Sequence, residues 1–263
     1  RVVSPYALAT FLVYAAGAEQ TLVAAGYLGT RDAAGGSAME RIDPRFPELN
    51  AYNLTQEAMS VEMVAELEPD VILNTARADW LDPIMELGIP IIRFEGESPD
   101  ALKEAVLLTG QLFGPDAVHR TQAWVEAYDA VLAEVSALTA SIDTRPRVLF
   151  TGTTPTSVAS GDMYQTAMIE AAGGESVSAD LTGYWNDVNL EQIIVWNPDV
   201  IFVPPYGGAT VEAITENPEW QMLDAVQNGH VYRIPKLVAP WDTPVQDSLL
   251  GIIWMAERLH PGA

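Results

Sequence analysis

The sequence predicts an α/β protein of two similar lobes, each with a mainly parallel sheet flanked by helices, joined by a single long spine helix. Three observations lead to this prediction: a duplicated helix–strand motif, strand and helix signals that alternate in both halves, and a long uninterrupted helical segment between the halves. We place the N-terminal lobe at residues 1–114, the spine helix at 115–142 and the C-terminal lobe at 143–263.

The duplicated motif consists of an amphipathic helix, a Pro-Asp turn and an apolar strand. Residues 60–73 read SVEMVAELEPDVIL, and residues 189–202 read NLEQIIVWNPDVIF. Proline ends the helix, and the Val-Ile pair suits a strand that is covered on both faces. Two more pairs of segments match in the same order, residues 1–3 with 147–149 and residues 88–93 with 229–234. Each half therefore predicts the order strand–helix–strand–helix and a parallel sheet.

The spine helix is predicted from the segment between the halves. Pro115 suits a first helical turn, and residues 116–142 contain neither glycine nor proline. Apolar side chains recur there at spacings of three and four residues, as in Tyr128, Leu132 and Val135. A helix of about 25 residues is roughly 38 Å long, which is long enough to lie across two lobes.

Composition limits the possible partners. The 263 residues are 49% hydrophobic and 19% charged, as in globular proteins, and no apolar run is long enough to span a membrane. The net charge of −23 argues against nucleic acid and anionic membranes as partners. The acidic surface either keeps the protein soluble or docks on a basic partner. Cysteine is absent, which excludes disulfides and thiolate chemistry. Because residues 1–3 read as part of a strand, we expect a leader to precede Arg1.

Sequence signatures of catalysis are missing. The chain contains no Walker A motif, no GxGxxG, no GxSxG and no HExxH. The three histidines, His119, His230 and His260, are far apart in the sequence, so we expect no directly bound metal ion. The polar segment 152–157 is either an ordinary loop or a ligand-facing one. We therefore predict no catalytic residue, no metal site and no intrinsic cofactor.

A ligand site is predicted at the carboxyl ends of the strands, where open parallel sheets bind their ligands. The loops that follow the predicted strands are rich in aromatic residues, which can stack on a flat ligand. The first half also carries arginines near strand ends, among them Arg45 and Arg93, which either orient an anionic ligand or are solvated surface residues. The predicted ligand-binding residues are Tyr6, Tyr52, Arg77, Trp80, Tyr164, Tyr184, Trp185, Tyr206 and Trp241.

The ordered set of motifs resembles the class III periplasmic binding proteins of ABC importers, which carry ferric siderophores, haem, cobalamin and, in some branches, molybdate or tungstate. The segments that carry the resemblance are 61–72, 171–174, 190–201, 217–220, 228–232 and 251–254. The resemblance implies a ligand held between two lobes and one acidic side chain per lobe that docks on the permease. By position these are Asp79 and Glu219, with Asp82 and Glu216 as alternatives. The family's usual glutamate in the first βα segment is missing, where Ala9-Thr10-Phe11 stands.

From these observations we predict the substrate-binding component of an ABC importer and not an enzyme. It is expected to capture a metal chelate (a ferric siderophore, haem or a corrinoid) in the cleft between the lobes and to deliver it to a permease. Alternatives are an oxyanion-binding member of the same family, for molybdate or tungstate, and an enzyme on the same two-lobed fold. We expect a monomer that acts outside the cytoplasm, in the periplasm or anchored by lipid to the outer face of the cytoplasmic membrane, without nucleic acid.

Overall fold

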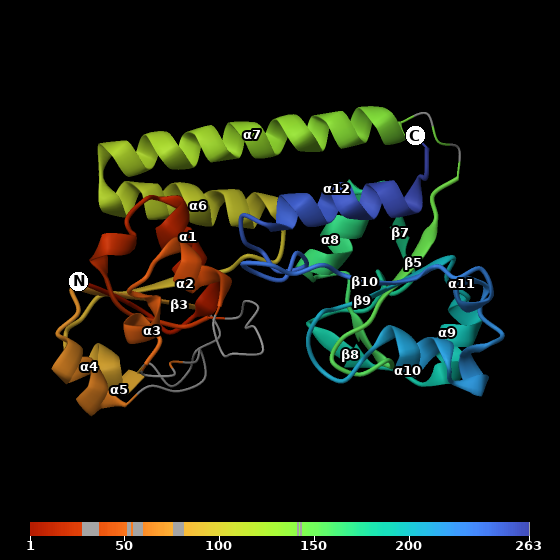
Figure 1. The fold of residues 1–263 in the computed structure, drawn as a ribbon, viewed down its shortest axis with the longest axis horizontal. Coiled ribbons are helices and arrows are strands. Elements are labelled where there is room, and N and C mark those ends of the chain that lie inside the picture. The colour runs from red at the N-terminus through yellow and green to blue at the C-terminus, as the bar shows by residue number, and fades with distance from the viewer. Residues whose placement is uncertain are drawn as a thin grey trace. The chain divides into compact units, whose positions relative to one another are not determined.

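The structure is a computed structural model that describes residues 1–27, 37–51, 54, 60–75, 82–140, 142 and 144–262. The chain forms two compact units (Figure 1). Unit 1 comprises Arg1–Gly96, Asp100–Glu126 and Leu237–Ala239, and unit 2 comprises Glu97–Pro99, Ala127–Lys236 and Pro240–Ala263. Helix α7 (Pro115–Thr139) begins in unit 1 and ends in unit 2, so the predicted uninterrupted helix is confirmed. The exact lobe limits at 114/115 and 142/143 stay a prediction.

Unit 1 contains a four-stranded parallel sheet with the order β2-β1-β3-β4. Its strands are β1 (Val2–Ser4), β2 (Leu22–Ala25), β3 (Val71–Thr75) and β4 (Ile91–Phe94). The described helices of the unit are α1 (Ala7–Ala15), the 3₁₀ turn η1 (Glu19–Thr21), α2 (Ala38–Ile42), α3 (Phe46–Leu49), α4 (Val61–Leu67), α5 (Asp82–Met85) and α6 (Pro99–Phe113). Side chains of α4 and α5 pack on this sheet, where Val64 and Ile84 join the buried Ile72.

Unit 2 repeats this sheet. Its parallel strands are β5 (Arg147–Phe150), β7 (Glu175–Ser176), β9 (Val200–Val203) and β10 (Val231–Arg233), in the order β10-β9-β5-β7. In both units the first strand along the chain lies between the second and the third, and the fourth strand is at the edge next to the third. The predicted duplication and the predicted fold class are therefore confirmed.

The helices of unit 2 follow the same alternation. They are α8 (Tyr164–Ala171), α9 (Leu190–Trp196), α10 (Val211–Thr215), the 3₁₀ turn η3 (Pro218–Trp220), α11 (Asp224–Gln227) and α12 (Ser248–Leu259). Ile193 of α9 and Ile214 of α10 pack with Ile201 of β9 in one buried cluster. Helix α12 runs alongside the second half of α7 in Figure 1, and side chains of both line one groove.

The duplicated motif has the same polar contacts in both units. Ser60 caps α4 by accepting a hydrogen bond from Met63 N at 3.1 Å, and Asn189 caps α9 in the same way. The aspartate of each Pro-Asp turn then holds the start of the neighbouring strand. The Asp70 carboxylate accepts a hydrogen bond from Arg1 N at 2.7 Å, and the Asp199 carboxylate accepts one from Arg147 N at 2.7 Å. Both contacts fix where the first strand of a unit begins beside its third strand.

A small antiparallel sheet in unit 2 is an addition to the predicted pattern. Strand β6 (Ser157–Ala159) pairs with β8 (Trp185–Asp187), so that Ala159 lies opposite Trp185. Both segments were predicted as loops, the first of them either ordinary or ligand-facing and the second with Trp185 as a ligand contact. The correction has a local cause, because Ser157 and Val158 are buried against the sheet, and Val188 N donates to Thr156 O to extend the pairing.

Candidate functional site

The loops at the carboxyl ends of the unit 2 strands are tied together through backbone contacts. The loop after β9 carries Tyr206, and next to it Gly208 N and Ala209 N both donate to Thr153 O, in the loop after β5, at 2.8 Å. Gly207 adopts a positive φ of 75°, and a Cβ atom there would lie 2.6 Å from Thr153 Cα. Glycine is therefore required where the chain turns after Tyr206.

Tyr206 and Asp242 form the main side-chain contact of this region. The Tyr206 hydroxyl donates a hydrogen bond to Asp242 Oδ2 at 2.6 Å. Asp242 follows the excursion after β10 and is completely buried. Gln165, on α8, donates from Nε2 to the backbone oxygen of Asp242 at 3.0 Å. One buried carboxylate thus connects the loop after β9 with the loop after β10, and α8 supports it.

Burial governs the protonation of this pair. It raises the pKa of Asp242 to about 6, because the apolar surroundings disfavour the charged form, while hydrogen bonds from Tyr206 and Gln165 act in the opposite direction. Burial and the neighbouring Asp242 carboxylate both raise the pKa of Tyr206, and the charge of Glu97 adds to this effect. Tyr206 is therefore a neutral donor, and Asp242 is a carboxylate at neutral pH that takes up a proton in mildly acidic conditions.

Several buried polar atoms of Gln165 and of residues 241–246 lack a hydrogen-bond partner within the part of the chain that the structure describes. They are Gln165 Oε1, Trp241 Nε1, Asp242 Oδ1 and Gln246 Nε2. Buried polar atoms are normally paired, so the three unpaired atoms within residues 241–246 mark a segment that is a candidate for binding a polar group. Sequence reasoning selected Tyr206 and Trp241 but missed Asp242 and Gln165. The only sequence signal for Asp242 was its position directly after Trp241, which had been selected.

The other predicted aromatic residues of unit 2 differ in exposure. Tyr184 is 46% exposed, and Trp185 on β8 is half-buried with its ring 6.4 Å from that of Phe150. Both retain surface that a ligand can contact. Tyr164 has no exposed surface, and its hydroxyl lies 2.9 Å from that of Tyr128 and 2.7 Å from Ser248 Oγ. This burial speaks against the predicted ligand contact for Tyr164. Sequence patterns do not distinguish a tyrosine that faces a ligand from one that packs in the core.

Unit 1 offers fewer described candidates. Tyr6 precedes α1 and is half-buried. Arg45 is engaged, because its guanidinium pairs with Asp43 at 2.6 Å. Although burial acts to raise the pKa of Asp43, hydrogen bonds from Arg45 and Tyr14 hold it below its usual value. Arg45 therefore has a structural partner. Four predicted residues, Tyr52, Arg77, Asp79 and Trp80, lie outside the described residues, and so does the side chain of Asp82.

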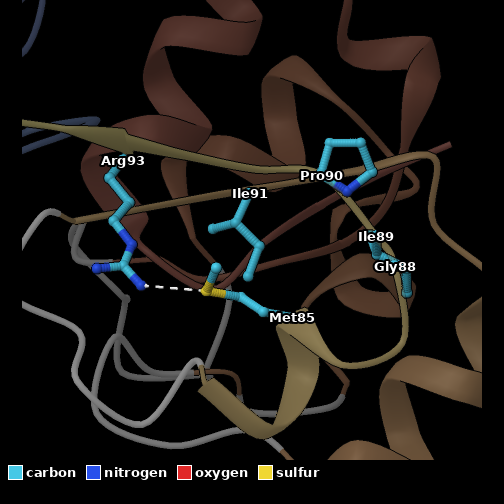
Figure 2. A pocket seen from close by; sticks show the side chains of 6 residues that line it. All are labelled: Met85, Gly88, Ile89, Pro90, Ile91 and Arg93. Carbon is cyan, nitrogen blue, oxygen red and sulfur yellow. Dashed lines mark hydrogen bonds between the residues drawn. The ribbon is translucent and has the colours of Figure 1, made fainter.

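A pocket of about 530 Å³ lies beside the edge strand β4. It is lined by Met85, Arg93 and residues 88–91, and Figure 2 shows Arg93 reaching from β4 toward Met85 at the end of α5. The guanidinium of Arg93 lies 3.7 Å from the Met85 sulfur. Within the described residues Arg93 has no carboxylate partner, so this apolar pocket has one free positive charge at its rim.

The predicted docking residue Glu219 lies on the surface of unit 2. It is exposed on the 3₁₀ turn η3, which begins with Asn217 accepting a hydrogen bond from Glu219 N at 3.0 Å. The next residue, Trp220, is buried and anchors the turn in the core. Glu216, the alternative, is also exposed and ends α10. A carboxylate on an anchored turn is presented in a fixed position.

Two kinds of feature are absent from the residues that the structure describes. Among these residues no three His, Asp or Glu side chains lie close enough together to hold a metal ion. No helix in the described ranges is long and apolar enough to cross a membrane.

Comparison with known proteins assigns the family. The periplasmic binding protein family matches residues 14–237. The chain belongs to this family. The resemblance found from the ordered motifs is thereby confirmed, and the duplicated sheets and long helix α7 agree with it.

Relatives that match the chain carry different names. The molybdate-binding protein MolA of Haemophilus influenzae is 26% identical over 232 residues, covering 78% of this chain and 64% of that protein. The chain thus spans less than two thirds of that relative. A vitamin B12-binding protein of Yersinia pestis is 28% identical over 211 residues, covering 77% of this chain and 69% of that protein. The solved structure of the periplasmic heme-binding protein RhuT from Roseiflexus is similar in fold, with a TM-score of 0.77 at 21% identity, covering 99% of each chain.

Proposed function

We propose that the protein is the substrate-binding component of an ABC importer, which captures a small ligand outside the cytoplasm and delivers it to a permease. The observation that carries this proposal is the family match over residues 14–237. The duplicated α/β sheets and the likeness of the whole chain to solved binding proteins support it. In this function the protein is a carrier and not an enzyme, it has no intrinsic cofactor, and it acts as a monomer.

The ligand we propose is a metal chelate such as haem, a corrinoid or a ferric siderophore. Tyr184, Trp185 and Trp241 offer ring surfaces near the carboxyl ends of the unit 2 strands, which suits a large flat ligand. The same region has the buried carboxylate of Asp242, with Glu97 nearby, and no positive charge from the described ranges contributes to the pKa of the pair. Negative charge there disfavours a bare oxyanion. The names of the vitamin B12-binding and heme-binding relatives agree with this choice.

An oxyanion is the second candidate, because the relative that is 26% identical is named for molybdate. Arg93, which is exposed and has no carboxylate partner among the described residues, is the side chain that favours this reading. Arginine binds tetrahedral oxyanions through paired N–H donors. Arg77, which lies outside the described residues, was predicted for the same role.

Docking on the permease is proposed to use one carboxylate from each unit. Glu219 supports this role by its exposure and by the anchored turn that carries it. Its proposed counterpart is Asp79, outside the described residues. A protein with a net charge of −23 is attracted to a basic docking surface at long range.

The decisive experiment is native mass spectrometry combined with visible absorption spectra of the purified protein, alone and after addition of haemin, cyanocobalamin or sodium molybdate. A haem or corrin band with the matching mass increase supports a chelate. A colourless increase that fits molybdate alone would replace the chelate by the oxyanion. If none of the three probes binds at micromolar concentration, and no ligand copurifies, this set of ligands is wrong.

A further inference from the structure

The Tyr206–Asp242 pair joins two loops that each carry an aromatic residue from the predicted ligand set. Tyr206 is in the loop after β9, and Trp241 is in the loop after β10, directly before Asp242. The contact between the loops is the hydrogen bond of 2.6 Å from the Tyr206 hydroxyl to Asp242 Oδ2. Residues 36 positions apart in the sequence are thus held together by one proton donor and one carboxylate.

The loop that ends at Asp242 has an ordered stem. Lys236 and Pro240 form an antiparallel bridge, and Trp241 N donates to Pro235 O at 3.1 Å. On the other side, Gly251 of α12 lies so close that a Cβ atom there would be 2.3 Å from Trp241 O. The backbone around Trp241 and Asp242 is therefore held by contacts of its own. Because the carboxylate is fixed in this way, its hydrogen bond positions Tyr206.

The chemistry of the pair makes its strength depend on protonation. A hydrogen bond to a carboxylate is roughly twice as strong as one to a neutral acceptor. In buried surroundings the difference is larger, because water does not screen it. The groups that face the pair are Gln165 from α8 and Glu97, which adds negative charge near Tyr206. Among the residues that the structure describes, no cation contributes to the pKa of either partner, so protonation of Asp242 removes the main force on the Tyr206 hydroxyl.

We infer that Asp242 is a positioning residue of the ligand site, whose carboxylate holds Tyr206 and the adjoining loops in the form that binds ligand, so that ligand is released when this carboxylate takes up a proton. The inference rests on the proposed function. In the released form Asp242 stays buried but loses the hydrogen bond from Tyr206, which lowers its pKa in the held form. By linkage, a ligand that prefers the held form must therefore also favour the ionised carboxylate, so affinity decreases as the pH is lowered. The relevant range is around pH 6, where the buried Asp242 titrates.

The first test needs no ligand. The pKa of the Asp242 carboxyl group is measured by carbon-13 NMR in the wild type, in Tyr206→Phe and in the control Tyr232→Phe, which removes a hydroxyl from β10. Loss of the Tyr206 donor is expected to raise the pKa of Asp242, whereas the control leaves it unchanged. In addition, hydrogen exchange of the Gly208 amide, which donates to Thr153 O in the turn after Tyr206, is expected to speed up below pH 6 in the wild type but not in Asp242→Asn, after correction for its intrinsic pH dependence.

The second test measures affinity for whichever of haemin, cyanocobalamin or molybdate the wild type binds, between pH 5 and 8. Wild-type affinity is expected to fall about tenfold over this range, the effect of about 1.4 kcal/mol from one weakened hydrogen bond. Asp242→Asn, which keeps an oxygen acceptor at every pH, is expected to show a flat profile. Tyr206→Phe binds more weakly at pH 7.5 and is also flat.

The outcomes separate this inference from the proposed function. An unchanged Asp242 pKa in Tyr206→Phe, or parallel affinity profiles for the wild type and Asp242→Asn, would overturn the positioning role. If the wild type binds none of the three probes, the proposed ligand set fails, and the NMR and exchange results still decide whether Asp242 positions these loops.

Discussion

Glu68 and Asn197 end the equivalent helices α4 and α9 in the same left-handed backbone conformation, with φ angles of 44° and 41°. Among the described residues they are the only non-glycine residues with positive φ. In both cases the chain must turn sharply from a helix into the Pro-Asp segment that precedes a buried strand. The same strained conformation thus recurs at the same point of each unit, but the side chains that accept it differ.

Replacement of these two residues by glycine should stabilise the protein at one position only. Glycine adopts positive φ without strain, so Glu68→Gly, at an exposed side chain, is expected to raise the free energy of unfolding by about 0.5–1 kcal/mol. Asn197→Gly loses the bond from Asn197 Nδ2 to Asp224 Oδ2 and the bond from Asp224 N to Asn197 Oδ1. It should be neutral or destabilising. Urea unfolding of both variants checks this, and equal gains would contradict it.

Tyr164→Phe should lower stability without changing ligand affinity. Ser248 Oγ donates to Val245 O at 2.6 Å, so it accepts from the Tyr164 hydroxyl, which in turn accepts from Tyr128. Removing the middle hydroxyl breaks both of these hydrogen bonds, at a cost of about 2 kcal/mol. Tyr128→Phe removes the hydroxyl at the end of this series of hydrogen bonds and should lower the free energy of unfolding by less. Thermal unfolding and a binding titration measure the two effects, and weakened binding would return Tyr164 to the ligand site.

Asp242→Asn should stabilise the protein increasingly as pH rises from 4 to 7. The folded-state pKa of Asp242 is raised from 3.8 to about 6. Its favourable contribution is therefore full below pH 4 and is lost as pH rises through 6. A change in pKa from 3.8 to about 6 corresponds to about 3 kcal/mol in the difference between the free energies of unfolding of the variant and the wild type. Urea unfolding at pH 4, 5, 6 and 7 measures this difference, and a difference that does not change with pH would refute it.

Gly251→Ala should destabilise unit 2, because the added methyl group meets Trp241 O at 2.3 Å and Met168 Cε at 2.6 Å. Overpacking of this kind typically costs about 1–3 kcal/mol. Gly208→Ala is the matched control, since the nearest atom to its added Cβ is Thr153 O at 3.6 Å. The melting temperature should fall for Gly251→Ala alone. A similar fall in both variants would mean that the close contact at Gly251 is not the cause.

Glu219→Ala should impair uptake while ligand affinity and stability remain as in the wild type. The side chain is exposed, and the turn that carries it is held by Asn217 and Trp220, which the substitution leaves in place. Transport into vesicles that contain the cognate permease is the measurement, with Glu216→Ala compared in parallel. If Glu216→Ala reduces uptake and Glu219→Ala does not, Glu216 and not Glu219 is the docking residue.

The fold could be predicted to a large extent because its signals are local and occur twice. The Pro-Asp turn and the Val-Ile strand stand in the same order as residues 69–72 and 198–201, and each copy forms a capped helix followed by a central strand. The spine helix was predicted because no glycine or proline interrupts it. The β6–β8 sheet was missed because its strands have three residues each, too few to give a periodic signal.

The candidate site could be predicted only in part, because its contacts join distant segments. Tyr206 and Trp241 were selected from their places after strands, but the sequence contains no sign that Tyr206 reaches Asp242 or that Gln165 supports it. Tyr164 was selected by the same rule as Tyr206, yet it points into the core. Position after a strand thus identifies a loop, whereas the direction of a side chain depends on packing against helices far away in the chain.

The completeness of each sheet within its own half has a consequence for biosynthesis. All four strands of the first sheet lie between Val2 and Phe94, and the first strand of the second sheet begins only at Arg147. Hydrogen bonding in the first sheet therefore needs no residue that is synthesised later. As the chain emerges from a ribosome or a translocation pore, the first sheet can form its hydrogen bonds while the second half is still being synthesised. Strands of the two halves then do not compete for the same partners.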